Sequence, residues 1–252
     1  MPIWGMVIVV GAAALMAGLM VLVARYVPVD RREAHNDVVG FVYAVVGVIY
    51  AVVLAMVVID VLNTLDSAKV NTYAESNALI DLDWYARSLP QPAGAQIEGM
   101  TKAYTETVIN EEWPLLGRQQ SSATAWSQAR RLRTAVEAQQ PQTLGAQARY
   151  QAALQAAGAL SSARRQRVNE ATEAIPGLLW VALIIGGVVT VGFAFLFGMR
   201  GLVAHCAVVF SLTLVVGSLL LLIYELNYPF IGAIRVRPVA FELALNQMGR
   251  SD

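Results

Sequence analysis

Charged side chains that could act on an ion lie at the ends of long apolar stretches. Asp60 and Glu225 each close such a stretch, where an interfacial position at a helix end is the ordinary explanation. A basic set lies close to the same stretches along the chain and consists of Lys69, Arg164, Arg165 and Arg167. Basic side chains at a pore mouth favour anions, whereas Asp60 repeated around a symmetric ring would favour cations. These residues are therefore the candidates for ion selectivity.

Residue patterns that indicate an enzyme are absent from the sequence. There is no His-Glu-x-x-His, no Gly-x-Ser-x-Gly and no glycine-rich phosphate loop followed by Lys and Ser or Thr. Glu111 and Glu112 form a carboxylate pair, but neighbouring residues on a helix point in different directions, and a solvated helix end explains them better. We therefore expect no catalytic residue and no enzymatic activity.

The sequence also contains no pattern that indicates a bound cofactor or a nucleic-acid partner. Cys206 is the only cysteine, and no group of Cys and His has zinc-like spacing, so we expect no metal and no cofactor. The chain carries 18 basic and 18 acidic residues with no long run of one sign. The sequence therefore has no basic segment that would bind the phosphates of a nucleic acid, and we expect no nucleic-acid partner.

The elements that must position these residues are four long apolar stretches. They contain no Asp, Glu, Lys or Arg and cover Pro2 to Ala24, Val38 to Ile59, Ile175 to Met199 and Gly201 to Tyr224. Each exceeds the roughly 18 to 20 residues that a membrane-spanning helix needs. A hydrophobic fraction of 57% and a charged fraction of 14% agree with this. The lipid bilayer is thus an expected partner of a multi-pass protein.

The polar insertion between the second and third stretches is predicted to be helical throughout. Apolar residues recur at helical spacing in four segments, 70–89, 95–112, 123–139 and 146–174, which end at or near prolines or at the third span. We predict an all-α protein with an antiparallel helical bundle between spans two and three, whose outer helices continue into those spans without a break. The predicted domains are 1–62 (two spans), 63–174 (bundle), 175–226 (two spans) and 227–252 (an interfacial tail).

The second span carries a repeat of small and aromatic residues. Gly40, Tyr43 and Ala44 recur seven residues later as Gly47, Tyr50 and Ala51, so all six fall on one side of a helix. Two interpretations remain open and are compatible. Small residues let helices approach closely in lipid, which assigns Gly40, Ala44 and Ala51 to helix packing. The alternative is a pore in an oligomer, lined by Tyr43, Gly47, Tyr50 and Leu54.

Several ordered motifs resemble the bestrophin-like domain family of bacterial and plant membrane proteins. They are the glycine and tyrosine repeat from Gly40 to Ala55, Glu112-Trp113-Pro114, the run from Ala163 to Arg167 leading to Ile175-Pro176, and Pro229-Phe230-x-Gly232 followed by Val236-x-Pro238. The resemblance covers residues 36–242. It implies four spans with an inserted helical domain, a distant relation to the bestrophins, which are oligomeric anion channels, and no catalytic residue. One departure is that span two offers Tyr, Gly, Val and Ile instead of the run of Phe that narrows bestrophin pores.

Two functions are consistent with this sequence. The first is a homo-oligomeric ion channel, expected to conduct anions, whose pore is lined by the second span and whose partners are its own copies and small inorganic ions. The alternative is a non-conducting membrane sensor or scaffold whose helical domain binds a ligand or a partner protein. In either case we expect an integral protein of the bacterial inner (plasma) membrane.

Overall fold

The computed structural model describes residues 3–249, and these residues form helices and connecting loops without any strand. They divide into two compact units. The membrane unit comprises the residues up to Asn63, Ala174–Asn227 and Gly232–Ile234. The bundle unit comprises Thr64–Glu173, Tyr228–Ile231 and the residues from Arg235. The all-α fold predicted from the sequence is confirmed.

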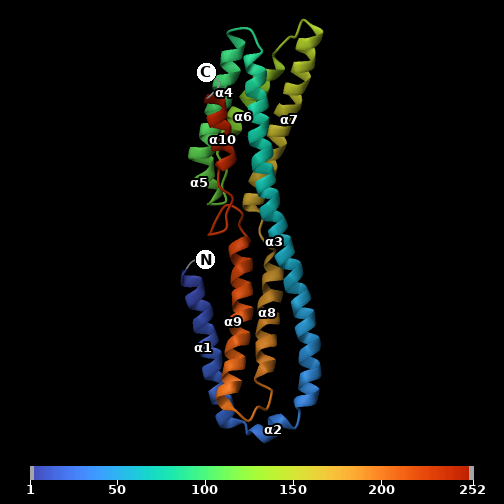
Figure 1. Cartoon of the computed structure of the whole chain (residues 1–252), viewed down its shortest axis with the longest axis vertical. Coiled ribbons are helices and arrows are strands. Elements are labelled where there is room, and N and C mark those ends of the chain that lie inside the picture. Colours follow the sequence, from blue (N-terminus) through green and yellow to red (C-terminus); the bar gives the residue numbers. More distant parts are fainter. Residues whose placement is uncertain (1–2, 250–252) are drawn as a thin grey trace. The chain divides into compact units, whose positions relative to one another are not determined.

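Four helices of the chain are long and apolar enough to cross a membrane. They are α1 (Ile3–Tyr26), α3 (Asn36–Arg87), α8 (Gly177–Ala194) and α9 (Leu202–Leu226) (Figure 1). Within the membrane unit, α1 and α8 both pack on α9. A Cβ atom placed on Gly217 of α9 would lie 3.0 Å from the Val9 side chain of α1, so this glycine permits the close approach of the two helices.

The short helix α2 (Val29–Glu33) and the start of α3 are attached to the turn between α8 and α9. The Asn36 side chain donates to the Gly198 carbonyl at 3.0 Å and accepts from the Gly198 amide at 2.8 Å. Arg200 forms an exposed ion pair with Glu33 at 3.2 Å. The paired hydrogen bonds satisfy backbone groups that a helix end would otherwise leave open.

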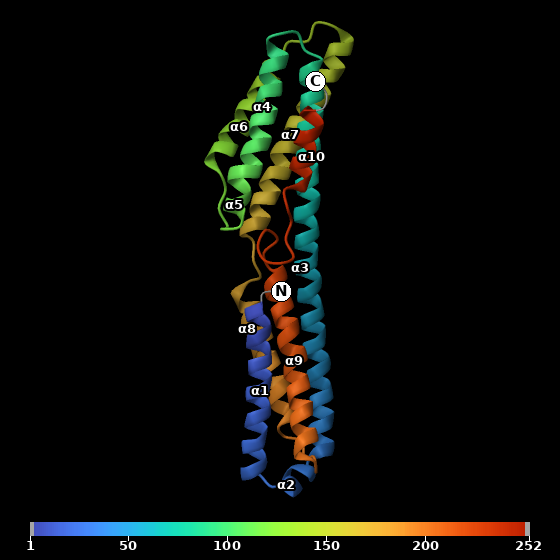
Figure 2. The same ribbon diagram turned by 60° about the vertical axis from the view of Figure 1, so that its left-hand side comes forward.

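The bundle unit is built from the remainder of α3 and the helices that follow it. These are α4 (Ala93–Thr107), a π-helical turn η1 (Val108–Glu112), α5 (Trp113–Leu116), α6 (Ala123–Glu137), α7 (Leu144–Thr172) and α10 (Val239–Gly249) (Figure 2). Ser122 and Thr143 cap α6 and α7 by accepting the amides of Ala125 and Ala146. The helices predicted in the inserted segment are thus present.

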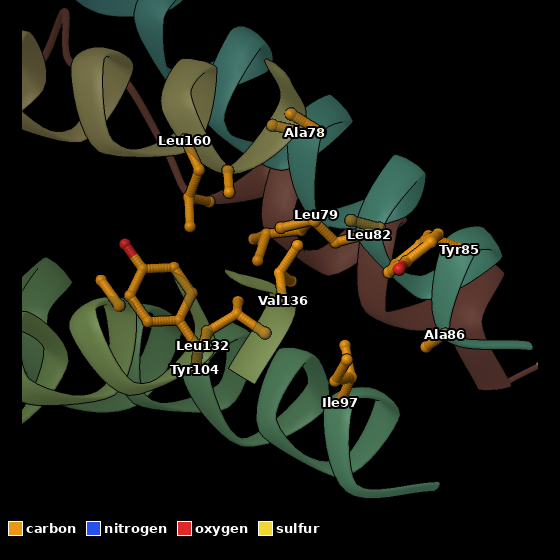
Figure 3. Close-up of a cluster of buried hydrophobic side chains, with 14 of the residues drawn as sticks. Ala78, Leu79, Leu82, Tyr85, Ala86, Ile97, Tyr104, Leu132, Val136 and Leu160 are labelled. Carbon is orange, nitrogen blue, oxygen red and sulfur yellow. The ribbon is translucent and has the colours of Figure 1, made fainter. Parts of the chain in front are cut away.

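A continuous apolar core holds the bundle together. Buried side chains of α3, α4, α6 and α7 meet in it, among them Leu79, Leu82, Ile97, Leu132, Val136 and Leu160 (Figure 3). Tyr85 and Tyr104 lie at opposite ends of the group drawn. Because these residues recur at steps of three and four along their helices, each helix turns one stripe inward.

The helix boundaries differ from the expectation on one side of the insertion. Helix α3 runs unbroken over 52 residues, as predicted, but α7 ends at Thr172 and α8 begins only at Gly177. Pro176 disfavours a helical conformation for the residue before it, and the Ile175 amide instead donates to the Asn227 side chain at 2.8 Å. The expected continuity of the fourth bundle helix with span three is therefore absent.

The end of the chain also differs from the expected interfacial tail. Helix α10 belongs to the bundle unit, and its Phe241, Ala244 and Met248 are buried in the apolar core. The Arg87 guanidinium donates to the Met248 carbonyl at 2.8 Å. The bundle thus has a fifth helical component that the sequence analysis did not assign to it.

Candidate functional site

One face of α3 packs inside the membrane unit. It carries three of the four residues expected to line a pore, Tyr43, Tyr50 and Leu54. Nothing lies within 4 Å of a Cβ added to the fourth, Gly47, whose assignment to a pore stays a prediction. The Tyr43 ring lies 5.6 Å from the Phe197 ring, and the Tyr50 hydroxyl donates to the Leu183 carbonyl at 3.1 Å. Tyr50 and Leu54 are each only 7% exposed. This corrects the expectation for Tyr50 and Leu54, because their side chains are used for packing within one chain.

A second contact shows how closely α3 and α8 approach at Tyr50. A Cβ atom on Gly186 would lie 2.5 and 2.7 Å from two atoms of the Tyr50 ring, which is closer than real side chains come. We expect Gly186→Leu to lower the free energy of unfolding by about 1–3 kcal/mol, as overpacking of a tight site does. Gly192→Leu on the same helix is the control, because nothing lies within 4 Å of its added Cβ. Thermal unfolding of both variants in detergent checks this, and equal midpoints would contradict it.

The small residues assigned to helix packing fall into two groups. Gly40 faces Phe197, whose ring would lie 3.8 Å from an added Cβ. Ala44 and Ala51 are exposed in the single chain. Their role in packing stays a prediction, and it concerns contacts with another subunit.

The opposite face of α3 is apolar and exposed. It is formed by Val38, Phe41, Val45, Val48, Val52, Met56 and Ile59, which we call the free stripe. These residues recur at steps of three and four, so they follow one side of the helix, about half a turn from Tyr43 and Tyr50. Their exposed fractions run from 45% for Val45 to 74% for Phe41. No charged residue interrupts the free stripe.

Two arginines of α7 form a buried ion network in the bundle. Arg164 binds both carboxylate oxygens of Glu112, each at 2.6 Å. Arg167 binds both oxygens of Glu75, at 2.7 and 3.0 Å, and also reaches Glu112 at 2.9 Å. All four side chains are fully buried. Two positive and two negative charges balance, and paired geometry of this kind gives strong, charge-assisted hydrogen bonds.

Tyrosine and tryptophan side chains complete the network. Tyr104 donates to Glu75 and accepts from Arg164 at 2.9 Å. The Arg164 guanidinium lies 4.6 Å from the Trp126 ring centre, and the Arg167 guanidinium lies 5.4 Å from that of Trp113. Aromatic faces attract a desolvated cation, so these contacts help to stabilise two guanidinium groups that each keep one buried nitrogen without a hydrogen-bond partner.

The charge states in the network follow from its geometry. Burial alone would raise the pKa of Glu112, but Arg167 and Arg164 outweigh it and hold that pKa below its usual value. Burial raises the pKa of Tyr104 well above 10, and the neighbouring Glu75 charge raises it further. The carboxylate of Glu112 is thus ionised and the phenol is neutral at ordinary pH.

This network corrects two expectations from the sequence. Arg164 and Arg167 cannot supply free positive charge at a pore mouth, because both are buried and neutralised by Glu75 and Glu112. Glu112 is not a solvated helix end, because none of its side chain is exposed. The signal that could have revealed this is the spacing Arg164-x-x-Arg167, which puts both arginines on the buried, alanine-rich face of α7.

The other candidates for selectivity are exposed. Lys69 and Arg165 lie on the surface of the bundle unit, and Asp60 lies on the surface near the end of the free stripe. Their assignment to a pore mouth stays a prediction.

Glu170 lies one helical turn beyond Arg167 and is 9% exposed. The Asn71 amide donates to one carboxylate oxygen at 2.6 Å, whereas the other oxygen has no partner. Burial, with help from the charge of Glu173, raises the pKa of Glu170 to about 7, although the Asn71 hydrogen bond acts against this. Glu170 is therefore a group whose charge changes near neutral pH.

The raised pKa makes stability depend on pH with a definite sign. In the unfolded chain Glu170 loses its proton near pH 4.5, but in the folded bundle it keeps the proton until about pH 7. The unfolded state therefore binds fewer protons in this range, and the contribution of Glu170 to stability falls as pH rises from about 4.5 to about 7. We expect Glu170→Gln to be more stable than the parent at pH 8, by up to about 3 kcal/mol, and unchanged at pH 4.5.

Unfolding of both proteins measured across this pH range checks the expectation. Glu106→Gln is the control, because it alters an exposed carboxylate of α4 that is not among the groups shifting the pKa of Glu170. Parallel profiles for the parent and Glu170→Gln would contradict it.

The fold and these contacts define a class, an integral membrane protein with four spans and a helical bundle inserted between spans two and three. A comparison with family models matches the Bestrophin-like domain over residues 10–241. The chain belongs to the bestrophin-like family, as its motifs suggested.

Two solved structures resemble the chain along nearly its whole length. One is a mutant of a bacterial bestrophin homologue from Klebsiella pneumoniae, with 14% identity, a TM-score of 0.72, and 97% of this chain and 98% of that chain covered. The other is a membrane protein variant with 14% identity and a TM-score of 0.69, where 97% and 96% of the two chains are covered. At this identity the likeness shows a shared fold. A comparison with curated proteins found no match.

Proposed function

We propose that this protein is a homo-oligomeric ion channel whose pore is lined by α3. The observation that carries the proposal is the free stripe, a row of large apolar side chains in a membrane span, each of which is 45% to 74% exposed in the single chain. In a closed ring, one α3 from each subunit can turn this stripe toward a common axis. Membership of the bestrophin-like family supports the proposal.

The residues proposed to line the pore differ from those expected from the sequence. Val45, Val48, Val52 and Met56 of the free stripe replace Tyr50 and Leu54, which are buried against the same chain. A ring of such side chains is a hydrophobic constriction, and constrictions of this kind gate by losing their water. The tyrosines then act indirectly, because they hold α3 against α8 and set the orientation of the stripe.

Anions are the proposed substrates. The free stripe carries no acidic side chain that would attract cations. Large monovalent anions also give up water more easily than small cations of equal charge, so an apolar constriction favours them. Lys69 and Arg165 are exposed basic residues that could raise the anion concentration at the mouth, against the opposing charge of Asp60.

The test measures both the number of subunits and the flux of ions. Native mass spectrometry of the protein in nanodiscs gives the number of subunits, and liposomes that contain chloride-sensitive or potassium-sensitive dyes give the flux of each ion. A ring of at least four subunits with faster chloride than potassium flux is expected. A monomer or dimer would contradict a pore built from one helix per subunit and would favour the scaffold alternative.

A further inference from the structure

A groove of about 700 Å³ runs along the membrane unit, lined by α1, α8 and α9. Its walls are almost entirely apolar and include Ile8 and Leu15 of α1, Ile184 and Val188 of α8, and Val216 and Leu220 of α9. The volume lies within the range of sites that bind small molecules, roughly 300 to 1,000 Å³. All three helices are membrane spans, so the groove is available to a molecule with an apolar body.

Glu225 supplies a negative charge among these apolar walls. It lines the groove, yet it is only 7% exposed. Its carboxylate accepts the Ala233 amide at 3.4 Å, a long hydrogen bond, and no Lys, Arg or His among residues 3–249 forms an ion pair with it. A buried carboxylate at a membrane surface is costly unless a cation faces it. The missing cation can come from a ligand.

Two aromatic rings lie in the lining of the groove together with Glu225. Trp180 and Tyr224 form an edge-to-face pair with ring centres 6.3 Å apart. Helix α8 begins at Gly177 and α9 ends at Leu226, so Trp180, Tyr224 and Glu225 mark one end of the groove. Trp and Tyr favour the membrane surface, and their rings attract cations. This end is therefore suited to a positively charged headgroup.

We propose that the groove binds a phospholipid with a primary-amine headgroup, with an acyl chain along α1 and α8 and the ammonium group at Glu225. A primary ammonium offers N–H donors to a carboxylate, a quaternary ammonium offers none, and a headgroup of net negative charge is repelled. The bilayer itself supplies such a molecule continuously. The site does not depend on ion conduction, because every residue in it belongs to the membrane unit of one chain.

The headgroup test uses nanodiscs that contain equal amounts of phosphatidylethanolamine, phosphatidylcholine and phosphatidylglycerol with identical acyl chains. Native mass spectrometry then identifies the lipid that the protein retains. The parent is expected to retain phosphatidylethanolamine at least tenfold over phosphatidylglycerol, and Glu225→Gln should reduce this preference to near unity. Glu173→Gln removes an exposed carboxylate and should keep the preference. Equal retention of the three lipids by the parent would overturn the proposal.

A second pair of variants tests the position of the acyl chain without altering Glu225. Ala12 lines the groove, whereas Ala14, two residues further along α1, is exposed and does not. Ala12→Trp should fill the groove and lower retention of phosphatidylethanolamine at least tenfold, and Ala14→Trp should leave it unchanged. Unchanged retention in Ala12→Trp would overturn the proposal. The proposal would also be overturned if Ala12→Trp, but not Ala14→Trp, changed the number of subunits, because the groove would then be a contact between subunits.

Discussion

Arg167→Met is expected to lower the free energy of unfolding of the bundle by about 3–5 kcal/mol, the usual cost of breaking a buried ion pair from one side. The guanidinium binds Glu75 through two hydrogen bonds and Glu112 through a third. Without it, the carboxylate of Glu75 is left buried without a cation in direct contact. Met replaces the aliphatic part of the arginine side chain but not the guanidinium, so the loss comes from the ion pairs, hydrogen bonds and ring contacts of that group.

The chain contains its own control for this substitution. Arg165 lies two residues away on the same helix but is exposed, and Arg165→Met should change stability by less than about 0.5 kcal/mol. Chemical unfolding in detergent, followed by tryptophan fluorescence, is a suitable readout because Trp113 lies beside Arg167. The double variant Glu75→Gln with Arg167→Met should recover part of the loss, since the charge that needs Arg167 is gone. A loss below 1 kcal/mol for Arg167→Met would mean that the network does not stabilise the bundle.

Val52→Asn in the free stripe is expected to raise ion flux through the protein about tenfold or more. A ring of amide side chains would hold water where a ring of valines excludes it, and a barrier lowered by roughly 1.4 kcal/mol multiplies a rate tenfold. Liposome flux assays at equal protein content measure this directly.

Val181→Asn is the matched control for this change. Val181 is as exposed as Val52, at 52% against 54%, but lies on α8, outside both the free stripe and the lipid groove. Its substitution should leave the flux within about twofold of the parent, on the same barrier scale. Equal effects of the two substitutions, or none from Val52→Asn, would exclude the free stripe from the ion path.

The sequence by itself determined the four spans and the helical nature of the insertion. Both depend on local properties, because the length of an uncharged stretch decides whether a helix can cross a bilayer, and apolar recurrence at three and four residues decides whether a helix can bury one side. The motifs from Gly40 to Pro238 also led to the family, and the match of the family model over residues 10–241 confirms it.

The candidate site could be predicted only in part. The sequence pointed to α3, but in a membrane span both faces are apolar, so composition cannot tell whether Tyr50 faces its own chain or a pore. Only the approach of α8, with Gly186 beneath the Tyr50 ring, decides which face is left free. Hydrophobic patterning orients a helix in water, but it loses this power in lipid.

Only the tertiary structure decided the state of the charged residues. Arg167 and Glu75 are 92 residues apart in the sequence, and Arg164 and Glu112 are 52 apart, so no local pattern pairs them. Helix α10 likewise joins a core formed by helices far away along the chain. A charged residue considered by itself is expected to be solvated, because burying it is costly without a partner of opposite charge. In this protein the partners come from distant parts of the chain, so only folding brings them together.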